Sequence, residues 1–376
     1  MKFKDEIFSP YIFLIGFIIF CIIGLLGRYY FVEYFNPDIS VYTLFYIILI
    51  TLVFILGSKI NIKINENLMI GLILFLIILF SFKRYNYYSI ILLLLGLLII
   101  SMIKKDIFSK YYKQIFGIGV LLCILNIGII GKIPLINPTI RESYLTPLFV
   151  LGYSFILISN NFGLLKEKYP NKMIFPILSL FLFILYGFRT YIVILVISTM
   201  ATFYLIGNKQ KTIYFGLIGS ILTIIFGYLT VLLLPQNWKL NPLELLWYRF
   251  TFTFDVFDRI CYNVGLKLFG EYSLLTETTT GYIISENILN YSHNITSTIF
   301  GPPIFDGGLS EIIIFTLFTS ISLFTIYKET KIHNSLIPYY SLILSIFLVS
   351  IEISPYPLII LLIPLALYLS KVNQIS

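Results

Sequence analysis

The chain has 376 residues, of which 59% are apolar and 12% charged, and its mean hydropathy is +0.94. A water-soluble domain needs more polar surface than this composition provides, so a soluble enzyme or binding module is excluded. The formal net charge of +8 follows the membrane topology described below, so it does not indicate nucleic-acid binding. The composition predicts an integral membrane protein.

Apolar runs separated by charged residues or by Pro, Gly and Asn predict an all-α bundle of about 12 transmembrane helices. The expected helices cover residues 10–26, 41–57, 68–82, 87–103, 115–131, 147–159, 173–187, 190–207, 213–234, 310–327, 335–351 and 357–370. The first is read as a retained helix, because no small-residue cleavage site follows it. The pair around Lys83 and Arg84 forms either two spans or a re-entrant hairpin. Residues 1–376 are thus expected to be one membrane domain, with one large loop over residues 235–309.

Lysines set the expected orientation, because basic residues in short loops are retained on the cytoplasmic side. With the N-terminus inside, every second connection carries lysines, as at Lys104, Lys113, Lys166 and Lys211. Both termini of this multi-pass cell-membrane protein are therefore predicted to be cytoplasmic, and the large loop external.

Arginine and lysine are distributed differently between the two sides of the membrane in this topology. In this topology all six arginines lie in external loops or at external helix ends, namely Arg28, Arg84, Arg141, Arg189, Arg249 and Arg259. Arginine offers a rigid fork of donors that binds phosphate in two places, which predicts an anionic ligand at the outer face. The alternative is that the arginines anchor helix ends or pair with acids such as Glu142, Asp255 and Asp258.

Arg189 lies in the short connection Gly187-Phe188-Arg189-Thr190, which we expect to be the whole external turn between two apolar helices. This position places its guanidinium at the level of lipid headgroups, where it suits a lipid phosphate. A positive charge at an external turn also opposes the orientation rule and therefore needs compensation.

The large loop is aromatic and amphipathic over Leu243–Leu268, which predicts one or two helices at the membrane interface. Arg249 and Arg259 would line a surface groove there. Further along, His293 is followed by a segment rich in glycine and proline. A histidine titrates near neutral pH and is a candidate general base, although an ordinary loop residue is the alternative.

Metal and thiol chemistry have little support in the sequence. The two histidines cannot form a multi-histidine metal site, and Cys21, Cys123 and Cys261 show no metal-ligand or disulfide spacing. We expect no metal and no cofactor.

With its hydropathy profile and the residues His293-Asn294, Arg189, Arg249 and Arg259, the chain resembles the O-antigen polymerase and ligase group of membrane glycosyltransferases. The resemblance implies a GT-C-like bundle with a large external loop late in the chain. It differs from metal-dependent glycosyltransferases, since the first external loop carries only Glu33 and Asp38 where those enzymes have an acidic metal-binding pair.

The resemblance also implies a reaction. A polymerase of this kind joins lipid-diphosphate-linked oligosaccharide repeat units at the outer face by metal-independent glycosyl transfer. Arg189, with Arg249 or Arg259, would hold the diphosphate of a polyprenyl carrier, His293 would activate or orient the acceptor, and Arg141 is a weaker candidate. Membrane lipids, a chain-length regulator and a flippase are the other expected partners. The alternative is that the protein is itself a transporter or flippase of lipid-linked oligosaccharides.

Overall fold

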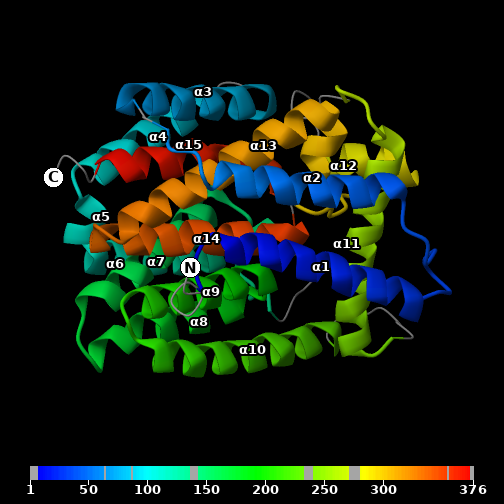
Figure 1. The fold of residues 1–376 in the computed structure, drawn as a ribbon. Helices are drawn as coiled ribbons and strands as arrows, with labels where there is room; N and C mark the ends of the chain where they lie inside the picture. The colour runs from blue at the N-terminus through cyan, green and yellow to red at the C-terminus, as the bar shows by residue number, and fades with distance from the viewer. Residues whose placement is uncertain are drawn as a thin grey trace. The chain divides into compact units, whose positions relative to one another are not determined.

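The computed structural model describes residues 7–62, 65–85, 88–135, 143–232, 240–270, 280–353 and 355–372, and their regular structure is helical, with no strand in these ranges. The all-α prediction is confirmed (Figure 1). The chain divides into two compact units. The first unit comprises Met1–Ser101, Glu244–Lys331 and Phe347–Ser376, and the second comprises Met102–Leu243 and Ile332–Ile346.

The first unit is built from long apolar helices and one transverse helix. Its elements are α1 (Tyr11–Tyr30), α2 (Val41–Gly57), α3 (Glu66–Tyr85), most of α4 (Tyr88–Lys104), α11 (Pro242–Val264), α12 (Thr280–Ile284), the π-helical turn η5 (Ser285–Leu289), α13 (Gly301–Thr330), the end of α14 (Ile337–Ile353) and α15 (Tyr356–Val372). Helix α13 packs on both α2 and α15, and α15 packs on α3. In contrast, α11 runs across the ends of α1 and α2 (Figure 1). This arrangement agrees with the expected interfacial helix, here a single one.

The second unit contains a tightly packed helix pair. Its elements are α5 (Ile107–Lys110), α6 (Tyr112–Ile130), α7 (Pro147–Lys166), the short η3 (Asn171–Met173), α8 (Ile174–Tyr186), α9 (Arg189–Leu205), α10 (Lys209–Leu232), η6 (Asn334–Leu336) and the start of α14. A Cβ on Gly119 of α6 would lie only 2.9 Å from the Gly152 carbonyl oxygen of α7. Glycine on both helices therefore permits close backbone approach, as in membrane helix pairs.

The observed helices overlap every expected helical range. In the described part of the chain, five are long and apolar enough to cross a membrane, namely Tyr11–Tyr30, Tyr112–Ile130, Pro147–Lys166, Gly301–Thr330 and Asn334–Ile353. Shorter apolar helices accompany them. The protein is a multi-pass membrane protein, and a total of about 12 spans stays a prediction.

The tenth expected helix begins earlier than predicted. Helix α13 starts at Gly301, where residues up to 309 were expected to be loop, and it contains one break at Gly308, with φ 56° and ψ −139°. Pro302 and Pro303 occupy the first turn, where a missing N–H leaves no intrahelical bond unmade. At Gly308 a Cβ would lie 2.2 Å from the carbonyl oxygen of Lys267. The glycine- and proline-rich composition thus produces a helical turn and a kink, and the loop boundary at 309 was wrong.

Contacts between helix ends agree with alternating helices in the first unit. At one end, the Lys328 Nζ donates to Asn61 Oδ1 at 3.0 Å, and the Tyr11 hydroxyl lies 3.1 Å from that of Ser58. These connections were predicted to share the cytoplasmic side. Which end faces outward remains a prediction.

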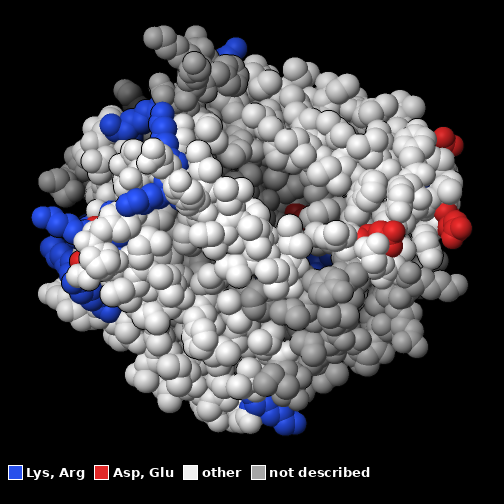
Figure 2. All heavy atoms as spheres, turned by 90° about the horizontal axis from the view of Figure 1, so that it is seen from below, with Lys and Arg blue, Asp and Glu red and all other residues white. Residues whose placement is uncertain are grey.

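Lysine-bearing connections also meet in the second unit. Lys113 pairs with Glu167 at 2.5 Å, and Lys166 donates to the Ser109 carbonyl oxygen at 2.6 Å. On the face drawn in Figure 2, lysine and arginine gather near one edge, while the visible acidic side chains lie mostly toward the opposite edge. Within the second unit, the contacts of Lys113 and Lys166 agree with their connections sharing one side of the membrane.

Candidate functional site

The candidate site is built on α11, which packs closely on α1. A Cβ on Gly24 would lie 2.4 Å from the Cβ of Phe254, and one on Gly27 would lie 1.8 Å from the Thr251 Oγ1. The two glycines lie on the same face of α1, one turn apart, so the helix offers a flat surface there. This close approach brings the carboxylates of α11 to Arg28, at the end of α1.

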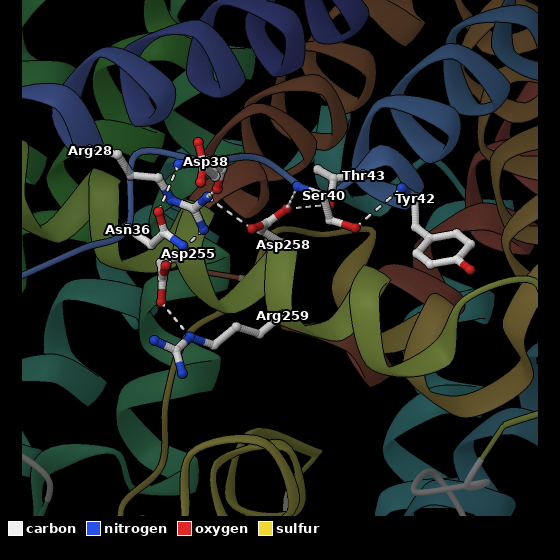
Figure 3. A network of polar contacts seen from close by, with 9 residues as sticks. All are labelled: Arg28, Asn36, Asp38, Ser40, Tyr42, Thr43, Asp255, Asp258 and Arg259. Carbon is white, nitrogen blue, oxygen red and sulfur yellow. Dashed lines mark hydrogen bonds and ion pairs between the residues drawn. The ribbon is translucent and has the colours of Figure 1, made fainter.

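Four charged residues form one ion-pair network in Figure 3. Arg28 Nη2 pairs with Asp255 Oδ1 at 2.7 Å, and Arg28 Nη1 pairs with Asp258 Oδ2 at 2.8 Å. The second oxygen of Asp255 accepts from Arg259 Nε at 2.7 Å. Asp255 therefore bridges a buried arginine and an exposed one, since the side chain of Arg28 is 1% exposed and that of Arg259 is 51% exposed.

The same network fixes the start of α2. Asp258 Oδ1 accepts from the backbone N–H of Ser40 at 3.0 Å and from Thr43 Oγ1 at 2.5 Å. Arg28 Nη1 also donates to the Asp38 carbonyl oxygen at 2.9 Å. A carboxylate at a helix N-terminus is favoured by the helix dipole. The network thus joins α1, α2 and α11 around balanced charges, and Arg28 has a structural part in it.

Arg249 and Arg259 share one mode of anchoring. Arg249 Nε donates to Glu352 Oε1 at 2.6 Å, and its side chain is 49% exposed. Arg259 is held by Asp255 in the same way, through Nε. Anchoring at Nε fixes the direction of the guanidinium and leaves its two terminal nitrogens without a hydrogen bond to any described residue, so that they can donate to an anion.

The two anchored arginines are held by different carboxylates. They lie ten residues apart on α11, which separates their Cα atoms by about 15 Å along the helix axis. Each is held to its own carboxylate at 2.6 to 2.7 Å. The helix therefore carries two separately anchored arginines.

The other predicted site residues are placed apart from this network. His293 is exposed in the stretch after η5 and has no hydrogen bond or ion pair to any described residue. Arg189 is the first residue of α9 and is partly exposed, so the turn is reduced to Gly187 and Phe188. It belongs to the second unit, so it is described separately from α11. Arg141 and Glu142 lie outside the described residues.

Pairing with acids, the alternative to ligand binding, is confirmed for Arg28, Arg249 and Arg259. Only the pair of Asp255 and Arg259 was visible as a helical spacing, i to i+4. The partners Arg28 and Glu352 were missed as site residues. No local signal marks them, because they lie 227 and 103 residues from their partners.

Other reactive groups on α11 are unsuited to acid–base or nucleophilic work. Burial raises the pKa of the Tyr248 hydroxyl, and burial raises the pKa of the Cys261 thiol well above its ordinary value. Both side chains therefore stay neutral. Among the described residues, no group of three or more His, Cys, Asp or Glu side chains is placed to hold a metal ion.

Comparisons with known proteins complete the description. The family model described as "Putative O-antigen polymerase" matches residues 6–363. A protein of Methanocaldococcus jannaschii, described as uncharacterized, is 29% identical over 291 residues, which cover 72% of this chain and 72% of that protein. No solved structure matches the chain.

Proposed function

The chain belongs to the O-antigen polymerase family, and from this premise we propose that it joins lipid-diphosphate-linked oligosaccharide repeat units at the outer face of the membrane. In this reaction an acceptor hydroxyl attacks the anomeric carbon of the donor glycan. The bond to the carrier diphosphate breaks, and negative charge grows on the phosphate oxygens. Groups that stabilise this charge more in the transition state than in the substrate accelerate the reaction.

The observation that carries the proposal is the anchoring of Arg249 and Arg259. Each guanidinium is about half exposed and fixed through Nε, at 2.6 and 2.7 Å from a carboxylate. A preoriented guanidinium donates to phosphate oxygens without losing much conformational entropy on binding. Positive charge supplied in this way makes the proposed transfer independent of a metal ion.

Two separate arginine positions also suit a polymerase. The donor and the acceptor are both lipid-linked in this reaction, so two diphosphates have to be held at once. The Cα atoms of Arg249 and Arg259 lie about 15 Å apart along α11, and each guanidinium is held by its own carboxylate. We assign one lipid diphosphate to Arg249 and the other to Arg259.

The remaining predicted residues complete the proposal. Arg189 lies at the N-terminus of α9, where a positive side chain opposes the helix dipole. Its forked donors suit a phosphate, so we assign Arg189, with Arg141 as a weaker candidate, to the phosphates of the carrier lipids. His293, exposed in the predicted external loop, would orient the acceptor glycan.

Deletion of the gene tests the function. Cells should accumulate carrier lipid bearing single repeat units, exposed on the outer leaflet and oxidised by membrane-impermeant periodate in right-side-out vesicles. Accumulation protected from periodate would instead indicate a flippase. Unchanged glycan lengths would contradict both functions.

Complementation of the deletion tests the arginines. Loss of an electrostatic donor to a transition state costs about 10²–10³-fold in turnover, so Arg249→Ala and Arg259→Ala should leave mostly single repeat units. The matched control is Lys168→Ala, an exposed cation of the second unit, which should restore normal glycan lengths. Normal lengths in both arginine variants would contradict their roles.

A further inference from the structure

Helix α13 carries a carboxylate held beside its break. Glu311 follows Gly308 by three residues, and the Tyr356 hydroxyl donates a hydrogen bond to its Oε1. A Cβ on Gly307 would lie 2.3 Å from the Glu311 Oε2 and equally close to its Cβ. The carboxylate therefore occupies the space that any side chain at position 307 would fill. Glycine there allows Glu311 to fold back over the break.

The break itself is fixed by the segment after α11. The backbone N–H of Leu309 donates to the Lys267 carbonyl oxygen at 3.0 Å, and Ser310 Oγ donates to that of Leu268 at 2.7 Å. The backbone that carries Glu311 is therefore held by residues that follow α11, the helix of the anchored arginines, within a few positions.

Glu311 and Arg249 both bind to residues at the connection between α14 and α15. Glu352, at the end of α14, accepts from Arg249 Nε at 2.6 Å, and Tyr356, at the start of α15, donates to Glu311. Tyr356 follows Glu352 by four positions, so their Cα atoms are at most about 14 Å apart. The guanidinium and the carboxylate are thus attached to the same short connection.

No described residue supplies a cation to compensate the charge of Glu311. It makes no ion pair with any described residue, and it is partly exposed while Tyr356 is 1% exposed. Burying part of a carboxylate near a membrane helix is costly without a counter-charge. A single neutral donor offsets little of that cost. Such an arrangement suits a group that gains a proton during a reaction.

We propose that Glu311 is the general base that accepts the proton of the acceptor hydroxyl, an inference that rests on the proposed function. As the acceptor oxygen bonds to the anomeric carbon, its proton moves to Glu311 Oε2. The bond from that carbon to the diphosphate oxygen breaks, and its electron pair stays on the diphosphate at Arg249. Tyr356 holds Oε1 and directs Oε2 toward the acceptor, and Glu311 later returns its proton to water. His293 then orients the acceptor and takes no proton.

The test uses the purified full-length protein in proteoliposomes, with lipid-linked repeat units extracted from deletion cells as the probe. A general base contributes about 10²–10⁴-fold, so Glu311→Gln should lower kcat at least 100-fold. The amount of lipid-linked repeat unit that copurifies with this variant should equal that of the wild type. Arg249→Ala should copurify with less of this lipid than the wild type, because one of the two diphosphate positions is lost. Glu286→Gln removes an exposed carboxylate of the same unit and should leave kcat unchanged.

Other results overturn the assignment. A wild-type kcat in Glu311→Gln would contradict the role of Glu311 as general base. So would a kcat that is lost only in His293→Ala. Neither result would contradict the proposed function as a polymerase. No elongation by the wild-type protein would instead defeat the proposed function and this inference together. If Glu311→Gln fails to fold, Tyr356→Phe carries the test. It should lower kcat about tenfold with little change in KM, and an unchanged kcat would overturn the assignment.

Discussion

Basic residues are held in different ways in the two units. In the first, Arg28, Arg249 and Arg259 are fixed by carboxylates at 2.6 to 2.8 Å. In the second, Lys113 also pairs with a carboxylate, that of Glu167, at 2.5 Å. There, however, Lys166 donates to a backbone carbonyl at 2.6 Å, and the Lys211 Nζ lies 2.9 Å from the centroid of the Tyr169 ring. Carboxylate anchoring sets the direction of a planar fork, whereas a ring face or a single carbonyl holds an ammonium without orienting it.

The difference separates two uses of positive charge. Unoriented lysines supply the net charge that places a loop on one side of the membrane. Oriented arginines supply donors at fixed positions, which is what recognition of a phosphate requires. Substitutions that change the orientation of a cation without changing its charge, or its charge without its orientation, test this difference between the units.

The largest expected effect is on stability, at Arg28. Arg28→Ala leaves Asp258 and one oxygen of Asp255 without their buried cation, so the free energy of unfolding should fall by about 3–5 kcal/mol. Arg259→Ala removes a cation from the same Asp255 on its exposed side and should cost no more than about 1 kcal/mol. Unfolding in detergent, followed by circular dichroism, measures both. Equal losses would contradict the structural role of Arg28.

A substitution at Arg189 tests the orientation of the donors while the charge stays constant. Arg189→Lys keeps the cation and the topology but loses the forked donors, so elongation should fall about 10²-fold. Glycan length in complemented deletion cells is the measurement. Normal lengths in this variant would refute the assignment of Arg189 to a phosphate.

A smaller effect is expected where α11 meets α1. In Gly27→Ala the new Cβ would overlap the Thr251 Oγ1, at 1.8 Å. The helices must shift apart, which should cost about 1–3 kcal/mol of stability. Gly128→Ala in α6 is the control, because no atom lies within 4 Å of a Cβ there. An unchanged stability in Gly27→Ala would argue against the close packing of α11 on α1.

The smallest effect is expected at Glu167 in the second unit. Hydrogen bonds and the ion pair from Lys113, with a further bond from Tyr112, hold the pKa of Glu167 below its ordinary value. A lowered folded-state pKa contributes stability above the unfolded pKa, near 4.5, and this is lost as the pH falls further. At pH 7 this contribution is present in full, but it is small because Lys113 is 62% exposed and solvent screens the pair. Glu167→Gln should therefore lower the thermal midpoint only slightly at pH 7. A fall comparable to that of Arg28→Ala would remove the contrast between the units.

Much of the fold could be predicted from the sequence, because long apolar runs have few alternatives in a membrane protein. The expected helix over residues 41–57 coincides with α2, and the amphipathic stretch from Leu243 became α11. The start of α13 could not be predicted in the same way. Gly301, Pro302 and Pro303 are typical of a loop, and only the carbonyl oxygen of Lys267, which faces Gly308, explains a kinked helix there.

The candidate site was only partly predictable. Arg249 and Arg259 stood out because arginine avoids the predicted cytoplasmic side. Their anchors depend on tertiary packing, since Glu352 comes from α14 and Asp255 is shared with Arg28 across 227 residues of chain. Glu311 was passed over because a single glutamate at a helix end has no pattern in the sequence. Its bond to Tyr356 gives it a role.

Elongation by the purified protein tests the central claim most directly. Wild-type protein in proteoliposomes that contain lipid-linked repeat units from deletion cells should produce a ladder of lipid-linked glycans, each longer by one repeat unit on mass spectrometry. Arg249→Ala and Arg259→Ala should shorten the ladder to the single unit, whereas Lys168→Ala should not. A wild-type protein that leaves only single units, or arginine variants that give the full ladder, would contradict the account.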